Sequence, residues 1–206
     1  MKKLKSSLPN MILSLGIIGI VAGGLLGGMY AITKEPIEES EKKQLTESIA
    51  EVAPAFTNSS EADCDTINME GKDFVIYPAM DGDKLNGAAV LGYTMEGFSG
   101  EVAILCGFEA DGTVKDYRVI RHAETPGLGA KMEDWFHDPT GARSVIGKNP
   151  SVQSFYVTKD KSKNGEIDAI TAATISSRAF LGVMRDAYMA YRDYAAGKGV
   201  ELSPVK

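Results

Sequence analysis

The chain has 206 residues, of which 44% are hydrophobic and 24% charged, a size that suits one globular domain with an appendage and excludes two large domains. The formal net charge is −6, and removing the three positive charges of Lys2, Lys3 and Lys5, which precede the first apolar run, leaves −9 for the rest. An acidic body of this kind lacks the basic face that nucleic-acid phosphates require, so a nucleic-acid-binding protein is excluded.

The first predicted element is a transmembrane helix. No charged residue occurs from Ser6 to Thr33, and Met11–Ile32 is almost entirely apolar or glycine. As a helix this run spans roughly 33 Å, close to the thickness of a bilayer's hydrocarbon core. Lysines precede it and acidic residues follow it, so the positive-inside rule predicts a cytoplasmic N-terminus and an extracytoplasmic remainder. A cleaved signal peptide is the alternative, against which the length of the run argues.

Three parts follow from this assignment. Residues 1–33 form the cytoplasmic N-terminus and transmembrane helix, residues 34–54 a juxtamembrane helix or linker, and residues 55–206 the extracytoplasmic domain. The second part is expected to begin a new amphipathic helix at Pro36 and to end at Pro54. A polar loop is expected beyond it, at Asn58–Asp65.

The middle of the chain is β-like. Short apolar runs predict strands at Phe74–Tyr77 and Ala88–Tyr93. Two further runs, Val102–Phe108 and Val114–Arg121, flank an Asp111-Gly112 turn and predict a hairpin.

The last third of the chain mixes both kinds of element. We expect a short helix at Gly129–Phe136, strands at Val152–Thr158 and Glu166–Ile170, and a long helix ending at Gly197. Strands with a helix at each end indicate an α+β fold, an antiparallel sheet flanked by helices.

Metal-ligating and nucleophilic residues are sparse. His122 and His137 do not stand at metal-ligand spacing, and two thiols, Cys64 and Cys106, cannot by themselves hold zinc or an iron–sulfur cluster. Whether the two cysteines form a disulfide is left open. No nucleophile–base pair stands out, so no catalytic residue and no metal site are predicted.

The segment Asp168–Ser177 reads as a strand-to-helix turn of small residues and hydroxyls. Small side chains let a ligand approach the backbone, and a helix start favours a phosphate. Four hydroxyls are available as hydrogen-bond donors: Thr171, Thr174, Ser176 and Ser177. The alternative is that these hydroxyls only cap the helix.

This segment resembles the flavinylation motif of the FMN-binding subunits of two related membrane complexes: the G subunit of the Rnf ion-translocating ferredoxin:NAD oxidoreductase and the C subunit of the sodium-translocating NADH:quinone reductase. The resemblance implies an FMN joined through its phosphate to Ser176 by a dedicated FMN transferase that uses FAD. Thr171 opens the motif and Thr174 is its internal threonine. Two residues depart from the usual pattern: Ala172 replaces a glycine, and Ser176 replaces the commoner threonine.

A second block, Glu124–Gly129, is similar to a hexapeptide typical of the same subunits. The resemblance implies that this loop lies beside the flavin ring and that Glu124, Thr125, Leu128 and Gly129 contact the cofactor. With the flavinylation segment, the predicted cofactor-binding residues are Thr171, Ala172, Ala173, Thr174, Ser176, Ser177, Glu124, Thr125, Leu128 and Gly129.

The family's properties then imply an electron-carrying subunit of an Rnf-type ion-translocating oxidoreductase in the bacterial cytoplasmic membrane. It would relay single electrons between redox subunits, with the other Rnf subunits and the FMN transferase as partners and no catalysis of its own. A chain length near 200 residues favours the Rnf G subunit over the C subunit of the sodium pump. An alternative of another class is a membrane-anchored binding or assembly module without a redox role.

Overall fold

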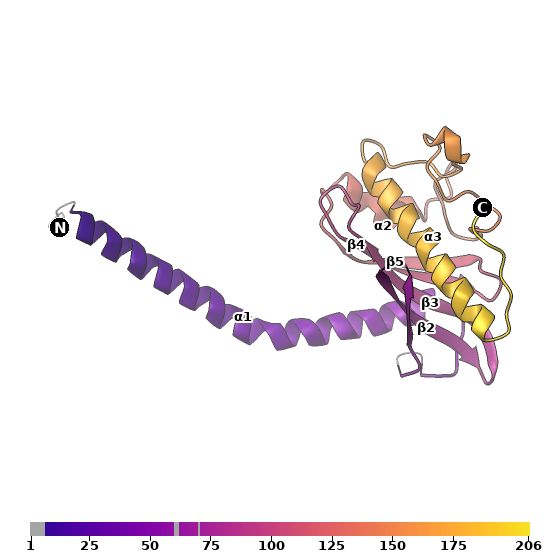
Figure 1. Cartoon of the computed structure of the whole chain (residues 1–206), viewed down its shortest axis with the longest axis horizontal. Helices are drawn as coiled ribbons and strands as arrows, with labels where there is room; N and C mark the ends of the chain where they lie inside the picture. The colour runs from indigo at the N-terminus through magenta and orange to yellow at the C-terminus, as the bar shows by residue number, and fades with distance from the viewer. Residues whose placement is uncertain (1–6, 60–61, 70) are drawn as a thin grey trace. The chain divides into compact units, whose positions relative to one another are not determined.

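The protein is seen here as a computed structural model that describes residues 7–59, 62–69 and 71–206 (Figure 1). Two compact units divide at Gln44 and Leu45. Lys2, Lys3 and Lys5, on which the predicted orientation in the membrane depends, lie outside the described residues, as do positions 60 and 61 of the predicted polar loop.

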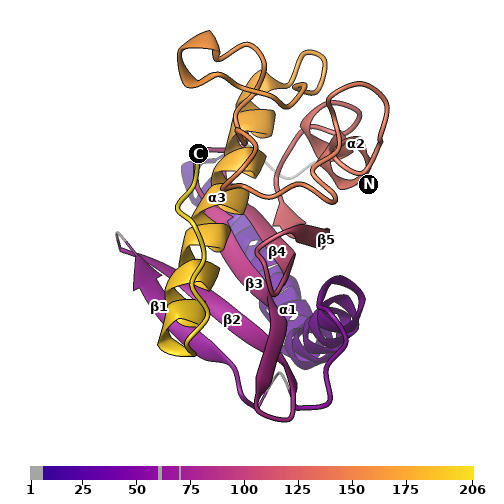
Figure 2. The same ribbon diagram turned by 90° about the vertical axis from the view of Figure 1, so that its right-hand side faces the viewer.

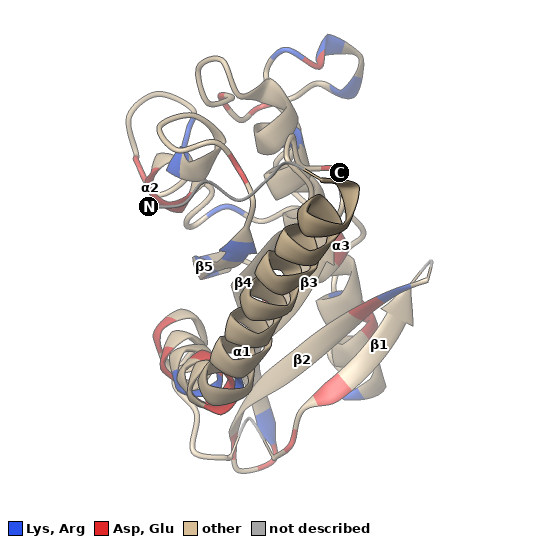
Figure 3. Ribbon diagram, turned by 90° about the vertical axis from the view of Figure 1, so that its left-hand side faces the viewer, with Lys and Arg blue, Asp and Glu red and all other residues tan. Residues whose placement is uncertain are grey.

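The first helix, α1 (Leu8–Val52), has 45 residues. Its apolar part is fully exposed, and within the described residues α1 is the one helix long and apolar enough to cross a membrane. In Figure 3 the ribbon of this part of α1 is tan, because it contains no Lys, Arg, Asp or Glu. The predicted apolar helix is confirmed.

The separate helix expected to begin at Pro36 is not a separate element, because α1 runs through Pro36 without a break. Proline removes one backbone hydrogen bond from a helix but does not force it to end. Lys34 and Glu38, one turn apart on either side of Pro36, form an ion pair of 3.8 Å across this turn.

Five strands form one antiparallel sheet in the order β1-β2-β3-β4-β5 (Figure 2). They are β1 (Asp65–Met69), β2 (Lys72–Asp81), β3 (Lys84–Thr94), β4 (Val102–Glu109) and β5 (Val114–His122). The four predicted strands of this region are confirmed as β2 to β5. The edge strand β1 was not predicted, because its Asp-Thr-Ile-Asn-Met sequence is mostly exposed and carries little apolar signal.

Helices cover both faces of the sheet. The last helix, α3 (Thr174–Gly197), packs across β1 to β4 (Figure 2). Its Phe180, Met184 and Tyr191 are buried in the core between the helix and the sheet. On the opposite face, Ile49 and Val52 at the end of α1 pack with Tyr77, Ala89 and Leu105. This arrangement confirms the predicted α+β fold.

The region between β5 and α3 is largely irregular. The predicted short helix is confirmed as a 3₁₀ turn, η1 (Gly129–Lys131), followed by α2 (Met132–Trp135). The predicted strands Val152–Thr158 and Glu166–Ile170 are wrong, since they share only one isolated parallel bridge, Val157 to Ile167. Phe155, Val157, Ile167 and Ile170 are buried all the same, because they pack under the loops against the α3 side of the core, whereas Val152 is exposed.

The two cysteines are free. Cys64 is exposed, whereas Cys106 lies in β4 beneath α3, with its Sγ 3.1 Å from the Sδ of Met184. No disulfide joins them in this structure.

Candidate functional site

The predicted flavin segment forms the start of α3. Its first helical residue is Thr174 and its N-cap is Ala173, with no side-chain hydrogen bond capping the helix. The hydroxyls of the segment are therefore not helix caps. The first N–H groups of a helix have no intrahelical partners, so this end of α3 favours an anionic ligand.

Ser177 fixes the turn that precedes the helix. Its fully buried hydroxyl accepts a hydrogen bond from the Ile170 N–H and donates one to the Ala173 carbonyl, each 2.9 Å long. Between these residues Ala172 adopts a φ of +62°, a conformation that glycine adopts without strain. Ser177 is thus a structural residue of the turn.

Ser176 connects the flavin segment to the hexapeptide 52 residues earlier. Its hydroxyl, in a residue only 1% exposed, donates a 2.8 Å hydrogen bond to Oε2 of Glu124. The other carboxylate oxygen, Oε1 of Glu124, accepts a 2.7 Å bond from the Phe98 N–H. One carboxylate therefore joins three segments that are distant in sequence.

The three segments enclose a pocket of about 300 Å³. It is lined by most of the predicted cofactor-binding residues, together with two others: Glu124, Thr125, Leu128, Gly129, Ala172, Ala173, Thr174 and Ser176, with Phe98 and Ile175. Of the predicted residues, Thr171 and Ser177 do not line it. Phe98, Leu128 and Ile175 are 66%, 41% and 49% exposed and form its apolar rim.

Phe98 and Ile175 were not predicted as site residues. Ile175 occupies the variable position of the motif, and Phe98 lies between Gly97 and Gly100 before the predicted hairpin. Nothing local indicated that the Phe98 backbone reaches Glu124.

Ser176 and Glu124 form a pair that the sequence did not reveal. No nucleophile–base pair was predicted, because the two residues stand 52 positions apart. A hydroxyl that donates to a carboxylate at 2.8 Å has the geometry of such a pair, since the carboxylate can accept the proton.

Thr174 contacts a cation, in contrast to Ser176, which contacts the Glu124 carboxylate. Its hydroxyl is partly exposed and accepts a 3.1 Å hydrogen bond from Nζ of Lys159. Thr174 and Ser176 therefore differ in their electrostatic surroundings: a cation contacts the first hydroxyl, and an anion contacts the second.

Hydrogen bonds to neighbouring loops hold Asp168, the first residue of the flavin segment. Its carboxylate accepts hydrogen bonds from the Thr158 hydroxyl at 3.1 Å and from the Ala142 N–H at 3.3 Å. The indole N–H of Trp135 donates to the Asp168 carbonyl at 2.9 Å. Trp135 thus stabilises the backbone at the start of the flavin segment and does not line the pocket.

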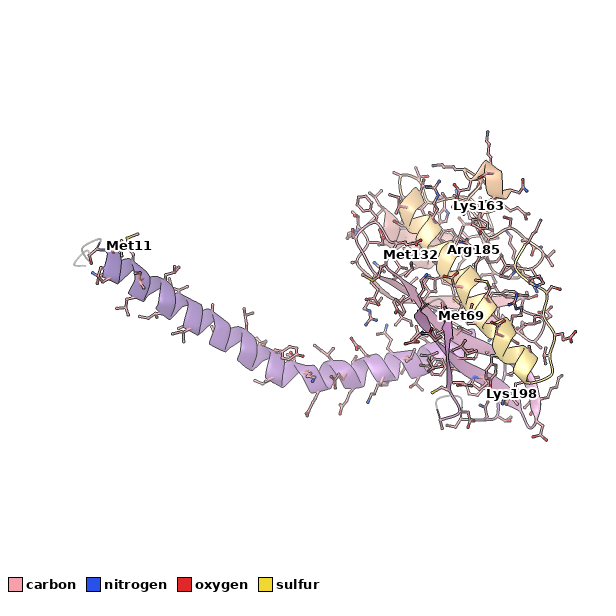
Figure 4. The ribbon with its side chains drawn as sticks, viewed as in Figure 1. Met11, Met69, Met132, Lys163, Arg185 and Lys198 are labelled. Atoms are coloured by element: carbon pink, nitrogen blue, oxygen red, sulfur yellow. The ribbon has the colours of Figure 1, made fainter. Side chains whose placement is uncertain are left out.

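A second, smaller cleft of about 150 Å³ lies along α3. Arg185 lies 3.8 Å over the Tyr156 ring, Lys163 lies 4.5 Å from it, and Arg178 pairs with Asp160 at 2.5 Å. Figure 4 labels Arg185 on α3 and Lys163 in the loop beside its start. These contacts hold the loop that carries Lys159 against α3.

The histidines have structural contacts. His137 stacks on Tyr117 at 4.0 Å, and its Nε2 lies 2.6 Å from Oδ1 of Asp116, while His122 lies 3.6 Å from Glu133. Within the described ranges, no group of three or more potential ligands could hold a metal ion.

The pocket fits a phosphorylated, ring-bearing cofactor such as FMN. An uncapped helix start with Lys159 and two hydroxyls suits a phosphate, and the rim of Phe98, Leu128 and Ile175 suits a planar ring. The volume of the pocket is at the lower end of the range of roughly 300–1,000 Å³ for ligand sites. A bound FMN would therefore be partly exposed.

Comparisons with known proteins agree with this chemistry. The FMN-binding domain family matches residues 97–189, which contain every residue that lines the pocket. The G subunit of the ion-translocating oxidoreductase complex of Aliivibrio fischeri strain ES114 is 29% identical over 88% of this chain and 89% of its own. Proteins of the same name from Vibrio vulnificus and Cereibacter sphaeroides are each 31% identical over 84% of this chain, and over 84% and 78% of their own.

Proposed function

From the premise that this chain belongs to the family of the G subunits of ion-translocating oxidoreductase complexes, we propose that it carries one covalently attached FMN and relays single electrons between redox centres of neighbouring subunits. The observation that carries the proposal is the pocket in which both family segments meet through the Ser176–Glu124 hydrogen bond. When bound, FMN supplies the electron chemistry, while the protein supplies position and electrostatic environment.

The residues of the pocket have separate tasks in this proposal. The start of α3 and Lys159 hold the phosphate, because a helix N-terminus and an ammonium group both favour an anion. Phe98, Leu128 and Ile175 shield the ring from water. Ser177 and Asp168 keep the turn in the conformation that presents the attachment point.

Ser176 is the proposed attachment point. The register of the family motif selects it, and its place in the pocket wall with a carboxylate beside its hydroxyl supports the choice. Thr174 is the competing hydroxyl, since it is more exposed and contacts Lys159. In this proposal Thr174 and Lys159 instead contact the phosphate that Ser176 carries.

Attachment replaces the diphosphate bond of FAD with a phosphoester bond to Ser176. The Ser176 oxygen forms a bond to the FMN phosphorus of FAD, the diphosphate bond breaks, AMP leaves, and the hydroxyl loses its proton. The FMN transferase that catalyses this step is a proposed maturation partner.

Mass spectrometry tests the covalent flavin. Full-length protein from cells that express the FMN transferase should gain the mass of one FMN less a water, and its fluorescence should survive denaturing electrophoresis. An unmodified mass would refute the electron-carrier proposal and leave the non-redox binding or assembly module.

Two matched variants separate the acceptors. Ser176→Ala should abolish attachment, whereas Thr174→Val, which removes the other hydroxyl with little change of shape, should retain it. The reverse pattern would move the attachment point to Thr174, and peptide mapping of the flavin-bearing fragment gives an independent answer.

The protein is membrane-anchored through α1, and we propose that its folded domain lies on the extracytoplasmic side of the bacterial cytoplasmic membrane beside the other subunits of the complex. The lysines before the apolar run support this orientation. An alkaline phosphatase fusion at Lys206 should be active, and an inactive fusion would reverse the orientation.

A further inference from the structure

Glu124 is a buried carboxylate in the wall of the pocket. It is 5% exposed, and within the described residues it forms no ion pair with lysine, arginine or histidine. Its two oxygens accept hydrogen bonds from the Phe98 N–H and the Ser176 hydroxyl. A buried carboxylate is costly unless it is hydrogen-bonded, so these two donors make its burial possible.

The surrounding backbone is shaped to admit this group. A Cβ atom at Gly97 would lie 2.8 Å from Oε1 of Glu124, and one at Gly129 would collide with both Oε2 and the Ser176 Oγ. A side chain at Gly129 would therefore displace the carboxylate or the hydroxyl, and one at Gly97 would collide with the Gly100 carbonyl as well as the carboxylate. Two glycines from two different segments therefore leave the space that the Glu124 carboxylate and the Ser176 hydroxyl occupy.

Joining the three segments does not in itself require a charge. A glutamine has the same shape, and its carbonyl oxygen could accept a hydrogen bond from Phe98 in the same way. What a glutamine cannot do is take a proton. The presence of a carboxylate, hydrogen-bonded to the hydroxyl of the attachment segment, points to proton transfer.

We propose that Glu124 is the general base of flavin attachment, accepting the proton of the Ser176 hydroxyl as its oxygen bonds to phosphorus. The inference rests on the proposed function and deepens it. The Ser176 O–H bond breaks, and the proton forms a bond to Oε2 of Glu124. The Ser176 oxygen bonds to the FMN phosphorus as the diphosphate bond of FAD breaks, and AMP leaves carrying the negative charge that the carboxylate loses.

This proton transfer also removes an electrostatic repulsion between Glu124 and the new phosphoester. A new phosphoester on Ser176 beside an ionised carboxylate would place two anions together in a site shielded from water. Once Glu124 holds the proton it is neutral and can donate a hydrogen bond to the phosphate. Lys159 and the start of α3 offset the charge of the phosphate itself.

Attachment kinetics test the inference. Full-length flavin-free protein is mixed with the FMN transferase and FAD, and covalent flavin is followed by fluorescence. Glu124→Gln keeps the shape and removes the base, so kcat should fall roughly 100-fold or more, with little change in the KM for the acceptor protein. Glu133→Gln, an exposed carboxylate on α2, is the matched control and should react at the unmodified rate.

The pH dependence provides a readout that a structural role would not move. The ratio of the unmodified rate to the Glu124→Gln rate should shrink as the pH falls, because a protonated carboxyl cannot accept another proton. Titration of the transferase affects both rates and cancels in this ratio. Among the described residues, the Nδ1 of His122 lies 3.2 Å from the Glu124 backbone nitrogen, and Lys159 contacts Thr174 in the same pocket. Both groups are present in the two proteins compared.

Three outcomes would overturn the inference. Glu124→Gln could attach flavin at the unmodified rate, its ratio to the unmodified protein could be independent of pH, or its loss could lie wholly in the KM. Loss of the native fold in Glu124→Gln, seen by circular dichroism, would assign the carboxylate to folding instead. Failure of the unmodified protein to take up flavin would refute the proposed function, which separates that failure from failure of the base.

Discussion

At the scale of single residues, Ala172 shows a conflict between residue type and backbone. It occupies the position where the related motif usually has glycine, and its φ is +62°. For an alanine this left-handed conformation costs roughly 1–2 kcal/mol, because Cβ crowds the carbonyl oxygen. The turn tolerates the strain because Ser177 ties both of its ends.

Ala172→Gly should therefore stabilise the folded protein by about 1 kcal/mol, the relief of strain being partly offset by the freer unfolded chain. Urea unfolding followed by circular dichroism measures the change. Ala173→Gly is the control, since φ is −132° there and no strain is relieved. Equal effects of the two substitutions would contradict the explanation.

Asp160 and Arg178 link the loop of Lys159 to α3. A hydrogen bond and ion pair from the Arg178 guanidinium hold the pKa of Asp160 below its ordinary value. A carboxyl whose pKa is lower in the folded state contributes stability above its unfolded pKa, and this contribution disappears as the pH falls through the folded pKa.

Arg178→Met should consequently lower the melting temperature at pH 7, and the difference from the unmodified protein should shrink below about pH 4. Thermal unfolding over a series of pH values measures it. Lys161→Met, in the same loop, should leave the pH profile unchanged. A difference between Arg178→Met and the unmodified protein that does not vary with pH would show that packing, not charge, is lost.

At the scale of elements, β4 explains why the sheet needs two covering layers. Every residue from Val102 to Phe108 is buried. Ile104, Cys106 and Phe108 face α3, while Leu105 on the other face packs with the end of α1. Such a strand reads as a continuous apolar run because neither face is solvated.

The two cysteines should differ sharply in reactivity as a result. Burial raises the pKa of the Cys106 thiol and blocks access to it, whereas Cys64 is exposed. In the native protein a maleimide should label one thiol rapidly, and denaturation without reductant should expose the second. If neither thiol were labelled even after denaturation, a disulfide would be indicated.

At the scale of the whole molecule, α1 has two roles. Its apolar N-terminal part anchors the chain in the membrane, and its last residues complete the core of the folded unit. Ile49 and Val52 are 2% and 0% exposed, and Lys115 donates hydrogen bonds to the Glu51 and Ala53 carbonyls at the helix end. One continuous helix therefore carries both the anchor and part of the core.

Truncation should separate the two roles. A protein that starts at Leu45 should remain folded and water-soluble, because it keeps the covering residues. One that starts at Phe56 should lose at least about 3 kcal/mol of stability, since two buried aliphatic side chains are removed and the sheet face is exposed. Thermal and urea unfolding of both proteins provide the measurement, and equal stability would contradict the role of Ile49 and Val52.

Much of this protein follows from local sequence signals. The length of the apolar run predicted the membrane helix, and helical spacing predicted α3. Short apolar runs predicted β2 and β3, and two runs flanking the Asp111-Gly112 turn predicted β4 and β5. Each of these elements is determined by residues close together along the chain and by the burial of its apolar side chains. The resemblance of two short segments indicated FMN and most of the residues that line the pocket.

Only the tertiary structure decided the remainder. Phe155, Val157, Ile167 and Ile170 carry the same local signal as strand residues, but they are buried beneath loops. An apolar residue is buried in either case, so its type does not show whether its backbone pairs with another strand. Likewise, the meeting of Glu124 with Phe98 and Ser176 joins residues 26 and 52 positions away. The pairing of a hydroxyl with a base, and of a second hydroxyl with Lys159, arises from through-space distances, which no spacing along the chain encodes.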